Sequence, residues 1–288
     1  MKKVYLKPFL KWAGSKRQLL QVIDRYIPQN YDKYFEPFLG GGSVFFHLMP
    51  EKAVINDINK ELMNSYLMIR DQLDSLMKIL DNHIYDEKYF YAVREVDRLD
   101  TYKKMTSVFK ASRFIYLNRV CFNGLYRVNQ KGQFNAPFGR YKNPTICNKI
   151  LLTNINLFLN NVDNEIKILN CDFEEALKGA KKGDFIYFDP PYDTDGSNFT
   201  NYTKKGFNKD DQIRLKKIID SLTNKGCKCL LSNSNTEFIQ ELYKNYLIKE
   251  VKANRLINSD SSGRGEVTEL LIMNYNVSEE YPSNKLTG

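Results

Sequence analysis

Short apolar runs alternate with amphipathic stretches near both ends of the chain. The apolar runs predict strands at residues 34–37, 53–55, 166–169, 185–188, 228–232, 247–251 and 270–275. Helical spacing predicts helices at residues 16–27, 210–224 and 236–246. Because strands that alternate with helices form parallel sheets, we expect an α/β fold with a mostly parallel, doubly wound sheet.

The pattern changes between residues 59 and 158. Long charged stretches with apolar residues at helical spacing predict a mainly helical insertion, with helices at 62–80, 87–99 and 105–120. A segment rich in Gly and Asn, 123–144, interrupts these helices. We therefore expect a discontinuous α/β domain, 1–58 with 159–288, and an inserted domain at 59–158.

Three glycines and an acid follow the first two predicted strands. Gly40, Gly41 and Gly42 lack Cβ atoms, so the backbone can turn sharply and approach a ligand, although a purely structural turn is the alternative. Asp57 ends the second strand, where a carboxylate can accept hydrogen bonds from both hydroxyls of a ribose. The alternative for Asp57 is a cap of the helix that begins near Asn59. No Lys-Ser/Thr pair follows the glycines, so a nucleoside without phosphates fits better than a P-loop nucleotide.

The tetrapeptide Asp189-Pro190-Pro191-Tyr192 directly follows the apolar run 185–188. A carboxylate and a backbone carbonyl can accept both N–H bonds of an aromatic amine and so favour a pyramidal, more nucleophilic nitrogen. The prolines stiffen the loop, and the tyrosine ring can stack on an extruded base. A rigid proline turn is the alternative. The segments 199–202 and 206–207 follow this motif and are candidates to close over a flipped base, with simple packing as the alternative.

Basic residues concentrate between positions 119 and 142. The whole chain has 43 Lys and Arg against 34 Asp and Glu, and its net charge of +9 fits a polyanionic partner. The segment 119–142 holds five cations and no acid, and Asn129-Gln130-Lys131-Gly132 within it is a candidate hairpin tip. A basic hairpin can neutralise phosphates and place side chains in a groove, whereas a solvated basic loop is the alternative.

The composition excludes several other classes of protein. At 42% hydrophobic and 27% charged residues, the chain is typical of a globular protein. Its five cysteines include no C-x-x-C pair, so we expect neither disulfides nor a zinc site, and a cytoplasmic location. His47 and His83 lie far apart, so we expect no metal and no catalytic histidine. We find no signal-peptide core and no apolar run of the roughly 18 residues that a membrane span needs.

Three motifs together resemble one enzyme family. The segment 8–16 (PFLKWAGSK), the loop 36–42 (EPFLGGG) and the DPPY motif at 189–192 are similar to those of Dam-type (DpnII/MboI-like) DNA adenine-N6 methyltransferases, in the same order along nearly the whole chain. The resemblance implies a Rossmann-like S-adenosylmethionine-dependent methyltransferase fold with an inserted helical target-recognition domain that carries a β-hairpin. It also implies base flipping and methylation of adenine in GATC.

The resemblance assigns residues to the cofactor S-adenosyl-L-methionine. The matching positions are Trp12, Ala13, Gly14, Lys16, Phe38, Gly40, Gly42, Asp57, Asp172 and Phe173. Asp57 matches the acid that binds the ribose, and Asp172 with Phe173 matches the pair that holds the adenine. For Asp172 an ordinary helix N-cap is the alternative. Ser15 stands where the family usually has a second glycine, and a serine at positive φ would be strained.

The resemblance also assigns the catalytic and DNA-binding residues. Asp189 and the Pro190 carbonyl would orient the amine, Pro191 would stiffen the loop and Tyr192 would stack on the adenine. The matching DNA-binding positions are Lys11, Phe122, Asn123, Leu125, Arg127, Pro137 and Arg140. Arg127 would read guanine, Leu125 and Pro137 the thymine methyl, and Phe122 would wedge into the stack. Asn123 would meet the orphaned base, Arg140 a phosphate and Lys11 the flanking DNA.

The expected partners follow from this interpretation. We expect double-stranded DNA as substrate, S-adenosylmethionine as cofactor, no metal, no membrane and a monomeric enzyme. A cognate restriction endonuclease of the same system is a candidate partner that need not form a complex with the chain. The alternatives are a nucleic-acid-binding protein that has lost catalysis and a methyltransferase that acts on RNA or on cytosine N4.

Overall fold

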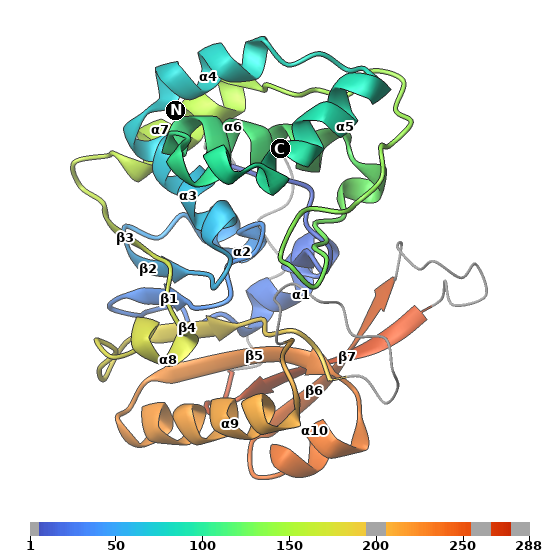
Figure 1. Ribbon diagram of the computed structural model, residues 1–288. Helices are drawn as coiled ribbons and strands as arrows, with labels where there is room; N and C mark the ends of the chain where they lie inside the picture. The colour runs from blue at the N-terminus through green and yellow to red at the C-terminus, as the bar shows by residue number, and fades with distance from the viewer. Residues whose placement is uncertain (1–5, 194–205, 255–265, 278–288) are drawn as a thin grey trace.

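The fold is built around a seven-stranded sheet (Figure 1). A computed structural model describes residues 6–193, 206–254 and 266–277. The strands are β1 (Tyr34–Glu36), β2 (Lys52–Asn56), β3 (Glu165–Leu169), β4 (Phe185–Phe188), β5 (Lys228–Ser234), β6 (Leu247–Asn254) and β7 (Glu266–Met273). Their order is β3-β2-β1-β4-β5-β7-β6, and among these strands β7 alone runs in the direction opposite to the other six. The predicted mostly parallel α/β sheet is confirmed.

Helices cover both faces of this sheet, as expected for a doubly wound fold (Figure 1). One face is covered by α1 (Leu20–Ile23), α2 (Ser43–Leu48), α3 (Lys60–Asp71), α4 (Leu73–Asp81), α6 (Ser107–Val120) and α7 (Lys149–Leu159). The other face is covered by α8 (Phe173–Ala176), α9 (Lys209–Asn224) and α10 (Glu237–Leu242).

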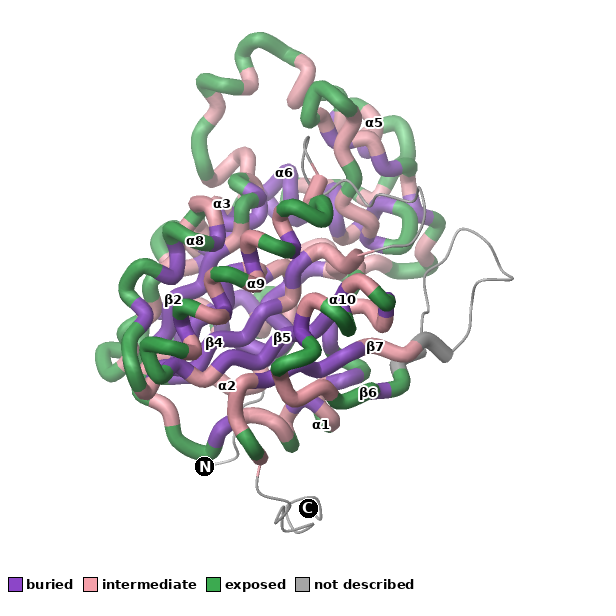
Figure 2. The backbone as a smooth tube through the Cα atoms, turned by 90° about the horizontal axis from the view of Figure 1, so that it is seen from below, coloured by how far each residue is buried: buried purple, intermediate pink, exposed green. Residues whose placement is uncertain are grey.

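The apolar runs of the strands reflect burial on both faces. In β4, Phe185 and Tyr187 belong to the core under α3 and α6, whereas Ile186 and Phe188 belong to the core under α9. Successive side chains of a strand point to opposite faces, so a strand between two helical layers needs apolar residues at every position. The central strands accordingly appear as buried stretches in Figure 2.

The helices of the predicted insertion join two cores. Residues of α3, α6 and α7, among them Tyr66, Phe114 and Ile155, share one hydrophobic core with the sheet. A separate small core lies between α5 (Glu87–Glu95), the end of α6 and the segment around Phe134. The helical content of 59–158 is confirmed, and the division of the chain into two domains stays a prediction.

Two of the predicted helical stretches are broken. Residues 62–80 form α3 and α4, separated at Gln72, whose φ of −140° and ψ of 36° are not helical. Residues 16–27 form two 3₁₀ turns, η1 (Lys16–Gln18) and η2 (Asp24–Tyr26), on either side of α1. The break at Gln72 lets the two helices run in different directions and still bury their own apolar faces, and no Gly or Pro marks it in the sequence.

Candidate functional site

The predicted cofactor and catalytic motifs meet at one edge of the sheet. The glycine loop follows β1, Asp57 follows β2, Asp172 follows β3 and Asp189 follows β4. These four strands are parallel neighbours, so their carboxyl ends lie side by side. The strand order also reverses between β1 and β4, which is where open α/β sheets bind their ligands. The site is therefore built from loops that are distant in sequence.

Two positions in the glycine loop need glycine. Gly40 has a φ of +50°, and a Cβ built there would lie 2.8 Å from the indole of Trp12. Gly42 has a φ of +71°, and its Cβ would lie 2.7 Å from the hydroxyl of Tyr66. Both positions would be strained and crowded with any other residue. The loop thus packs directly against the N-terminal motif.

Asp57 ties the end of β2 to the glycine loop. Its Oδ2 accepts a hydrogen bond from the backbone N–H of Gly40 at 2.9 Å, and its Oδ1 accepts one from the backbone N–H of Asn59 at 2.9 Å. Asn59, and not Asp57, caps α3, because its side chain accepts from Leu62 N–H. The alternative of Asp57 as the helix cap is therefore wrong. Burial raises the pKa of Asp57. Each carboxylate oxygen can accept two hydrogen bonds, so each can still accept one more.

The N-terminal motif forms a turn over this loop. The N–H of Ser15 donates to the carbonyl of Trp12, which encloses Ala13 and Gly14 in the turn. A Cβ at Gly14 would meet no atom within 4 Å, so this backbone faces open space. Ser15 has a φ of −54° and an Oγ 2.7 Å from Ser43 Oγ. The departure from glycine at Ser15 therefore causes no backbone strain.

Lys16 joins this motif to the DPPY loop. Its Nζ lies 2.7 Å from Asp189 Oδ1, 2.9 Å from the carbonyl oxygen of Gly14 and 4.7 Å from the ring centroid of Tyr192. Lys16 is only 6% exposed and Asp189 is 21% exposed. Burial raises the pKa of Asp189 to about 6, although the Lys16 ammonium acts in the opposite direction.

Polar side chains from three elements hold the DPPY loop. Gln212 of α9 donates from Nε2 to the Pro191 carbonyl at 3.0 Å, and Asn233 of β5 donates to Gln212 Oε1 at 3.1 Å. The hydroxyl of Tyr192 donates to Glu269 Oε2 of β7 at 2.6 Å. None of these three side chains was identified from the sequence, because they lie 21 to 77 residues from the residues that they contact.

The loop continues into Asp193, which is held in the same way. Ser234 Oγ donates to the Asp193 carbonyl at 2.7 Å, and Thr236 Oγ1 donates to Asp193 Oδ2 at 2.8 Å. Pro190 lies between Asp189 and the anchored Pro191 carbonyl. The loop is therefore fixed on both sides of the tyrosine.

An aromatic cluster flanks the glycine loop. The ring centroids of Phe38 and Phe173 are 5.1 Å apart, and Phe207 lies 5.7 Å from Phe38. Arg214 makes two 3.0 Å hydrogen bonds to the two carboxylate oxygens of Asp172, and its guanidinium carbon lies 4.3 Å from the Phe173 centroid. Phe207 thus packs on the predicted cofactor side, whereas the predicted closing segment 199–202 lies outside the described residues.

Asp172 also acts as a helix cap. Its side chain accepts a hydrogen bond from Glu174 N–H at 3.0 Å at the start of α8. The N-cap interpretation is confirmed, and the adenine-binding role of Asp172 with Phe173 stays a prediction. Arg214, 42 residues away along the chain, carries no sequence signal for this contact.

Glu36, the first residue of the EPFLGGG loop, is a buried acid beneath the site. It is 2% exposed and accepts a 2.6 Å hydrogen bond from the hydroxyl of Tyr34. Burial raises its pKa to about 8, and the negative charge of Asp189 acts in the same direction. The raised pKa favours the protonated form of Glu36. Its only sequence signal is an acid that ends an otherwise apolar strand, which by itself indicates no role.

The predicted hairpin is present in the helical layer. Val128 and Phe134 pair as antiparallel partners, and Asn129 N–H donates to the Gln133 carbonyl at 2.8 Å. The N–H of Gly132 closes the tip on the Asn129 carbonyl at 2.8 Å. A φ of +78° at Gly132 fits this turn. The predicted tip at 129–132 is confirmed.

Most of the predicted base-reading residues lie on the surface around this hairpin. Phe122 is 51% exposed, and its N–H donates to the Pro137 carbonyl at 2.9 Å, which brings these two residues together. Arg127 is exposed and donates to the Asn135 side chain at 2.9 Å and to the Asn135 carbonyl at 3.2 Å. The other predicted positions are exposed or half-buried: Asn123, Leu125, Pro137 and Arg140.

Lys11 lies within the protein contacts that join the N-terminal motif to α6. Its Nζ lies 3.6 Å from the ring centroid of Tyr141 and 3.3 Å from the Arg119 carbonyl. The buried Asn118 bonds to both the N–H and the carbonyl of Lys11, at 2.8 and 2.7 Å. A Cβ at Gly124 would lie 2.3 Å from Lys11. Burial lowers the pKa of Lys11, and its contact with flanking DNA stays a prediction.

Two charged residues of the helical layer hold the hairpin by its backbone. Asp97 Oδ2 accepts from Phe134 N–H at 2.8 Å, and Arg98 donates to the Phe134 carbonyl at 3.1 Å. The same carboxylate pairs with the buried Arg113 at 2.9 Å. Asp97 and Arg98 therefore make hydrogen bonds with the backbone N–H and carbonyl of Phe134, as a neighbouring strand would. No sequence pattern indicates this clamp, because its parts lie 36 and 37 residues apart.

Other polar groups lie outside the site. His83 is bonded to Tyr89 and Ser112 in the helical layer, and burial lowers its pKa to about 4. His47 bonds to Asp24. In the part of the chain that the structure describes, no group of three or more His, Cys, Asp or Glu could hold a metal ion. No helix within the described ranges is long and apolar enough to span a membrane, and all five cysteines are free.

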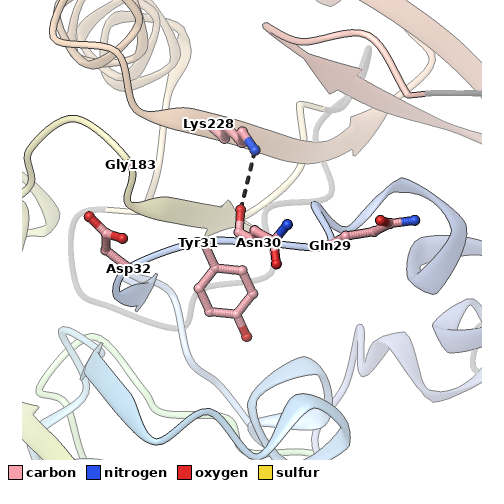
Figure 3. A pocket seen from close by; sticks show the side chains of 6 residues that line it. All are labelled: Gln29, Asn30, Tyr31, Asp32, Gly183 and Lys228. Atoms are coloured by element: carbon pink, nitrogen blue, oxygen red, sulfur yellow. Dashed lines mark hydrogen bonds between the residues drawn. The ribbon is translucent and has the colours of Figure 1, made fainter.

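A separate pocket of about 390 Å³ lies at the opposite edge of the sheet (Figure 3). It is lined by Gln29, Asn30, Tyr31, Asp32, Gly183 and Lys228, and Lys228 Nζ donates to the Asn30 carbonyl at 3.2 Å. All but Lys228, the first residue of β5, precede β1 or β4. The pocket therefore faces away from the carboxyl ends of the strands, where the predicted motifs meet.

Comparison with known proteins gives one consistent result. The family described as D12 class N6 adenine-specific DNA methyltransferase matches residues 12–257. The chain is 48% identical over 277 residues to the type II methyltransferase M1.LlaDCHI of Lactococcus lactis subsp. cremoris, covering 95% of this chain and 97% of that protein. It is 43% identical over 294 residues to the type II methyltransferase M.MjaIII of Methanocaldococcus jannaschii, covering 94% and 99%. A DNA adenine methylase of Vibrio cholerae serotype O1 is 34% identical over 278 residues, covering 93% and 95%.

Proposed function

Because the chain belongs to the D12 class N6 adenine-specific DNA methyltransferase family, we propose that this site holds S-adenosylmethionine beside an adenine extruded from duplex DNA. The chain is an enzyme that methylates adenine in DNA at N6. One observation carries the proposal for the site: Lys16, Asp189 and Tyr192 meet at the end of β4, beside the glycine loop.

The residues of the site fit the proposed cofactor. Asp57 keeps acceptor positions for ribose hydroxyls, and the half-buried Phe38, which packs against the buried Phe173, offers aromatic surface to an adenine ring. The turn at Gly14 presents backbone to open space. When bound, S-adenosylmethionine supplies an electrophilic methyl group on a sulfonium.

Asp189 and the Pro190 carbonyl then orient the adenine amine. Both accept its N–H bonds, which directs the nitrogen lone pair out of the ring plane and toward the methyl group. Asp189 must be ionised to act as a full acceptor, and the Lys16 ammonium at 2.7 Å favours the ionised form. Tyr192 stacks on the adenine, and the anchored loop keeps all three groups in place before the base arrives.

The hairpin reads the target sequence in this proposal, which we infer to be GATC. The exposed Arg127 makes a bidentate contact with guanine O6 and N7, worth about 1–3 kcal/mol. Phe122 supplies the wedge, and Leu125 and Pro137 contact the thymine methyl. A backbone hydrogen bond holds Phe122 beside Pro137. Asn123 lies beside Phe122 for the orphaned base. Full or partial exposure of these side chains around one hairpin supports the assignment.

The remaining parts of the proposal concern the setting of the enzyme. It acts as a monomer, because one site modifies one strand at a time. It works in the cytoplasm, where its DNA substrate is accessible. A cognate restriction endonuclease is a candidate companion that need not bind the methyltransferase, as the type II names of two relatives suggest.

Substitution of Asp189 tests the proposed site. Asp189→Ala is expected to bind duplex DNA with unchanged affinity and to lose transfer by about 10²–10³-fold in kcat, as when one preorganised group is removed from an active site. DNA binding is measured by fluorescence anisotropy and transfer with cofactor carrying a labelled methyl group. Asp163→Ala, an exposed aspartate before β3, is the matched control. Full methylation by Asp189→Ala contradicts the assigned role.

A further inference from the structure

Glu269 lies on β7, outside every motif that the family resemblance assigns. In the sheet it is paired with Ser234 of β5 and Val251 of β6. Its carboxylate accepts the 2.6 Å hydrogen bond from the hydroxyl of Tyr192, a residue 77 positions earlier in the chain. Such short hydrogen bonds to an ionised acceptor are about twice as strong as neutral ones.

The backbone around Tyr192 is already fixed. Gln212 holds the Pro191 carbonyl on one side, and Ser234 with Thr236 holds Asp193 on the other. The remaining freedom is rotation of the tyrosine side chain. Because the hydroxyl is at the far end of the ring, anchoring it on Glu269 restricts the ring as well.

A purely structural role explains this placement poorly. The negative charge of Glu269 raises the pKa of Asp189 and so disfavours the ionised form of that carboxyl group. An acid at this position therefore has an electrostatic cost next to the catalytic carboxylate. The hydrogen bond to Tyr192 is the contact that offsets this cost.

We propose that Glu269 is a positioning residue that acts through Tyr192 and holds its ring in the orientation in which the flipped adenine stacks. This inference rests on the proposed function, which assigns the stacking to Tyr192. Glu269 does not touch the reacting atoms. Because Glu269 restricts the Tyr192 ring beforehand, the ring loses less conformational entropy when the base stacks on it.

A double-mutant cycle tests the inference. Glu269→Ala and Tyr192→Phe each remove the same hydrogen bond and are each expected to lower kcat by about 10- to 100-fold, with the KM for the cofactor unchanged. The double variant is expected to be no slower than the slower single variant, because the two residues act as one unit. Glu269→Gln, which keeps an acceptor oxygen, is expected to restore most of the rate.

A fluorescent base in place of the target adenine gives a second readout. 2-Aminopurine is quenched when it stacks, so complexes of Glu269→Ala and Tyr192→Phe are expected to be brighter than the wild-type complex, to the same extent as each other. Glu250→Ala, an exposed glutamate on β6, is the matched control. Melting temperatures check that each variant is folded, and Tyr192→Phe tests the same bond if Glu269→Ala does not fold.

The outcomes separate the inference from the proposed function. If Tyr192→Ala leaves the fluorescence of the flipped base unchanged, the stacking role of Tyr192 is wrong, and the inference fails with it. If Tyr192→Ala changes the signal but the effects of Glu269→Ala and Tyr192→Phe on kcat multiply, Glu269 does not act through Tyr192. That second result overturns the inference alone.

Discussion

At the scale of single residues, the proposed site depends on the charge of one half-buried carboxyl group, that of Asp189. Asp189 is surrounded by groups with opposite effects on its pKa: burial and Glu269 raise it, and Lys16 lowers it. The net result, a pKa of about 6, leaves the group mostly ionised at neutral pH and protonated in mild acid. A protonated Asp189 has lost an acceptor for the amine.

This balance predicts the pH dependence of the reaction. The kcat at saturating cofactor and DNA is expected to rise with pH through a midpoint near 6 and to level off above neutrality, because the ionised form of Asp189 is the active one. Lys16→Gln is expected to move the midpoint to higher pH, since the ammonium favours the ionised carboxylate. Single-turnover rates between pH 5 and 8 measure both. A flat wild-type profile contradicts the role of Asp189.

The residue types of the motifs predict the centre of the site but not its supports. The glycines at 40 and 42, the acid at 57 and the DPPY loop all lie at the ends of parallel strands, as the sequence pattern predicts. Their supporting partners were not predictable. Arg214 reaches Asp172 and Glu269 reaches Tyr192 across 42 and 77 residues, and no local pattern indicates such contacts.

At the scale of secondary-structure elements, the hairpin proposed to read DNA depends on the helical layer for its position. Its own pairing is short, and the adjacent residues Asp97 and Arg98 bind both backbone polar groups of Phe134. Tyr126, between the predicted readers Leu125 and Arg127, stacks on Trp12 with ring centroids 5.6 Å apart. The hairpin is therefore attached both to the helices and to the cofactor motif.

Loss of this clamp is expected to weaken sequence discrimination. Asp97→Ala frees the Phe134 N–H and leaves the buried Arg113 without its 2.9 Å partner, so stability falls by about 3–5 kcal/mol. The ratio of kcat/KM for GATC against a site with one changed base pair is expected to drop about tenfold, within the 1–3 kcal/mol of one base contact.

Two further variants complete this comparison. Asp97→Asn keeps an acceptor for the Phe134 N–H. Its stability and its discrimination ratio are expected to lie between those of the wild type and of Asp97→Ala. Asp100→Ala removes an exposed acid nearby and serves as the control. An unchanged discrimination ratio in a folded Asp97→Ala protein would show that the clamp supports the fold alone.

Element boundaries show where sequence reasoning stops. All seven strands of the described sheet were predicted, because burial on both faces gives the central ones compact apolar runs. The break between α3 and α4 at Gln72 was not predicted, because no helix-breaking residue marks it in the sequence. The split of 16–27 into short turns follows from tertiary contacts, such as that of Lys16 with Asp189.

At the scale of the whole molecule, the predicted cofactor and catalytic loops and the basic hairpin are held by different parts of the fold. The carboxyl ends of the parallel strands bring the predicted cofactor and catalytic loops together, and the helical layer holds the hairpin. The segment 119–142 carries five cations and no acid, which is more than half of the net charge of +9. A global excess of positive charge is thus concentrated on the element that is proposed to meet DNA.

The most direct test of the central claim is the identity of the methylated base. The enzyme is incubated with S-adenosylmethionine carrying a labelled methyl group and with two duplexes of equal composition, one containing GATC and one with that site scrambled. After digestion to nucleosides, we predict label in N6-methyldeoxyadenosine of the GATC duplex and none above background in the scrambled one. Equal labelling of both duplexes, or label in any other nucleoside, would contradict the proposed activity and specificity.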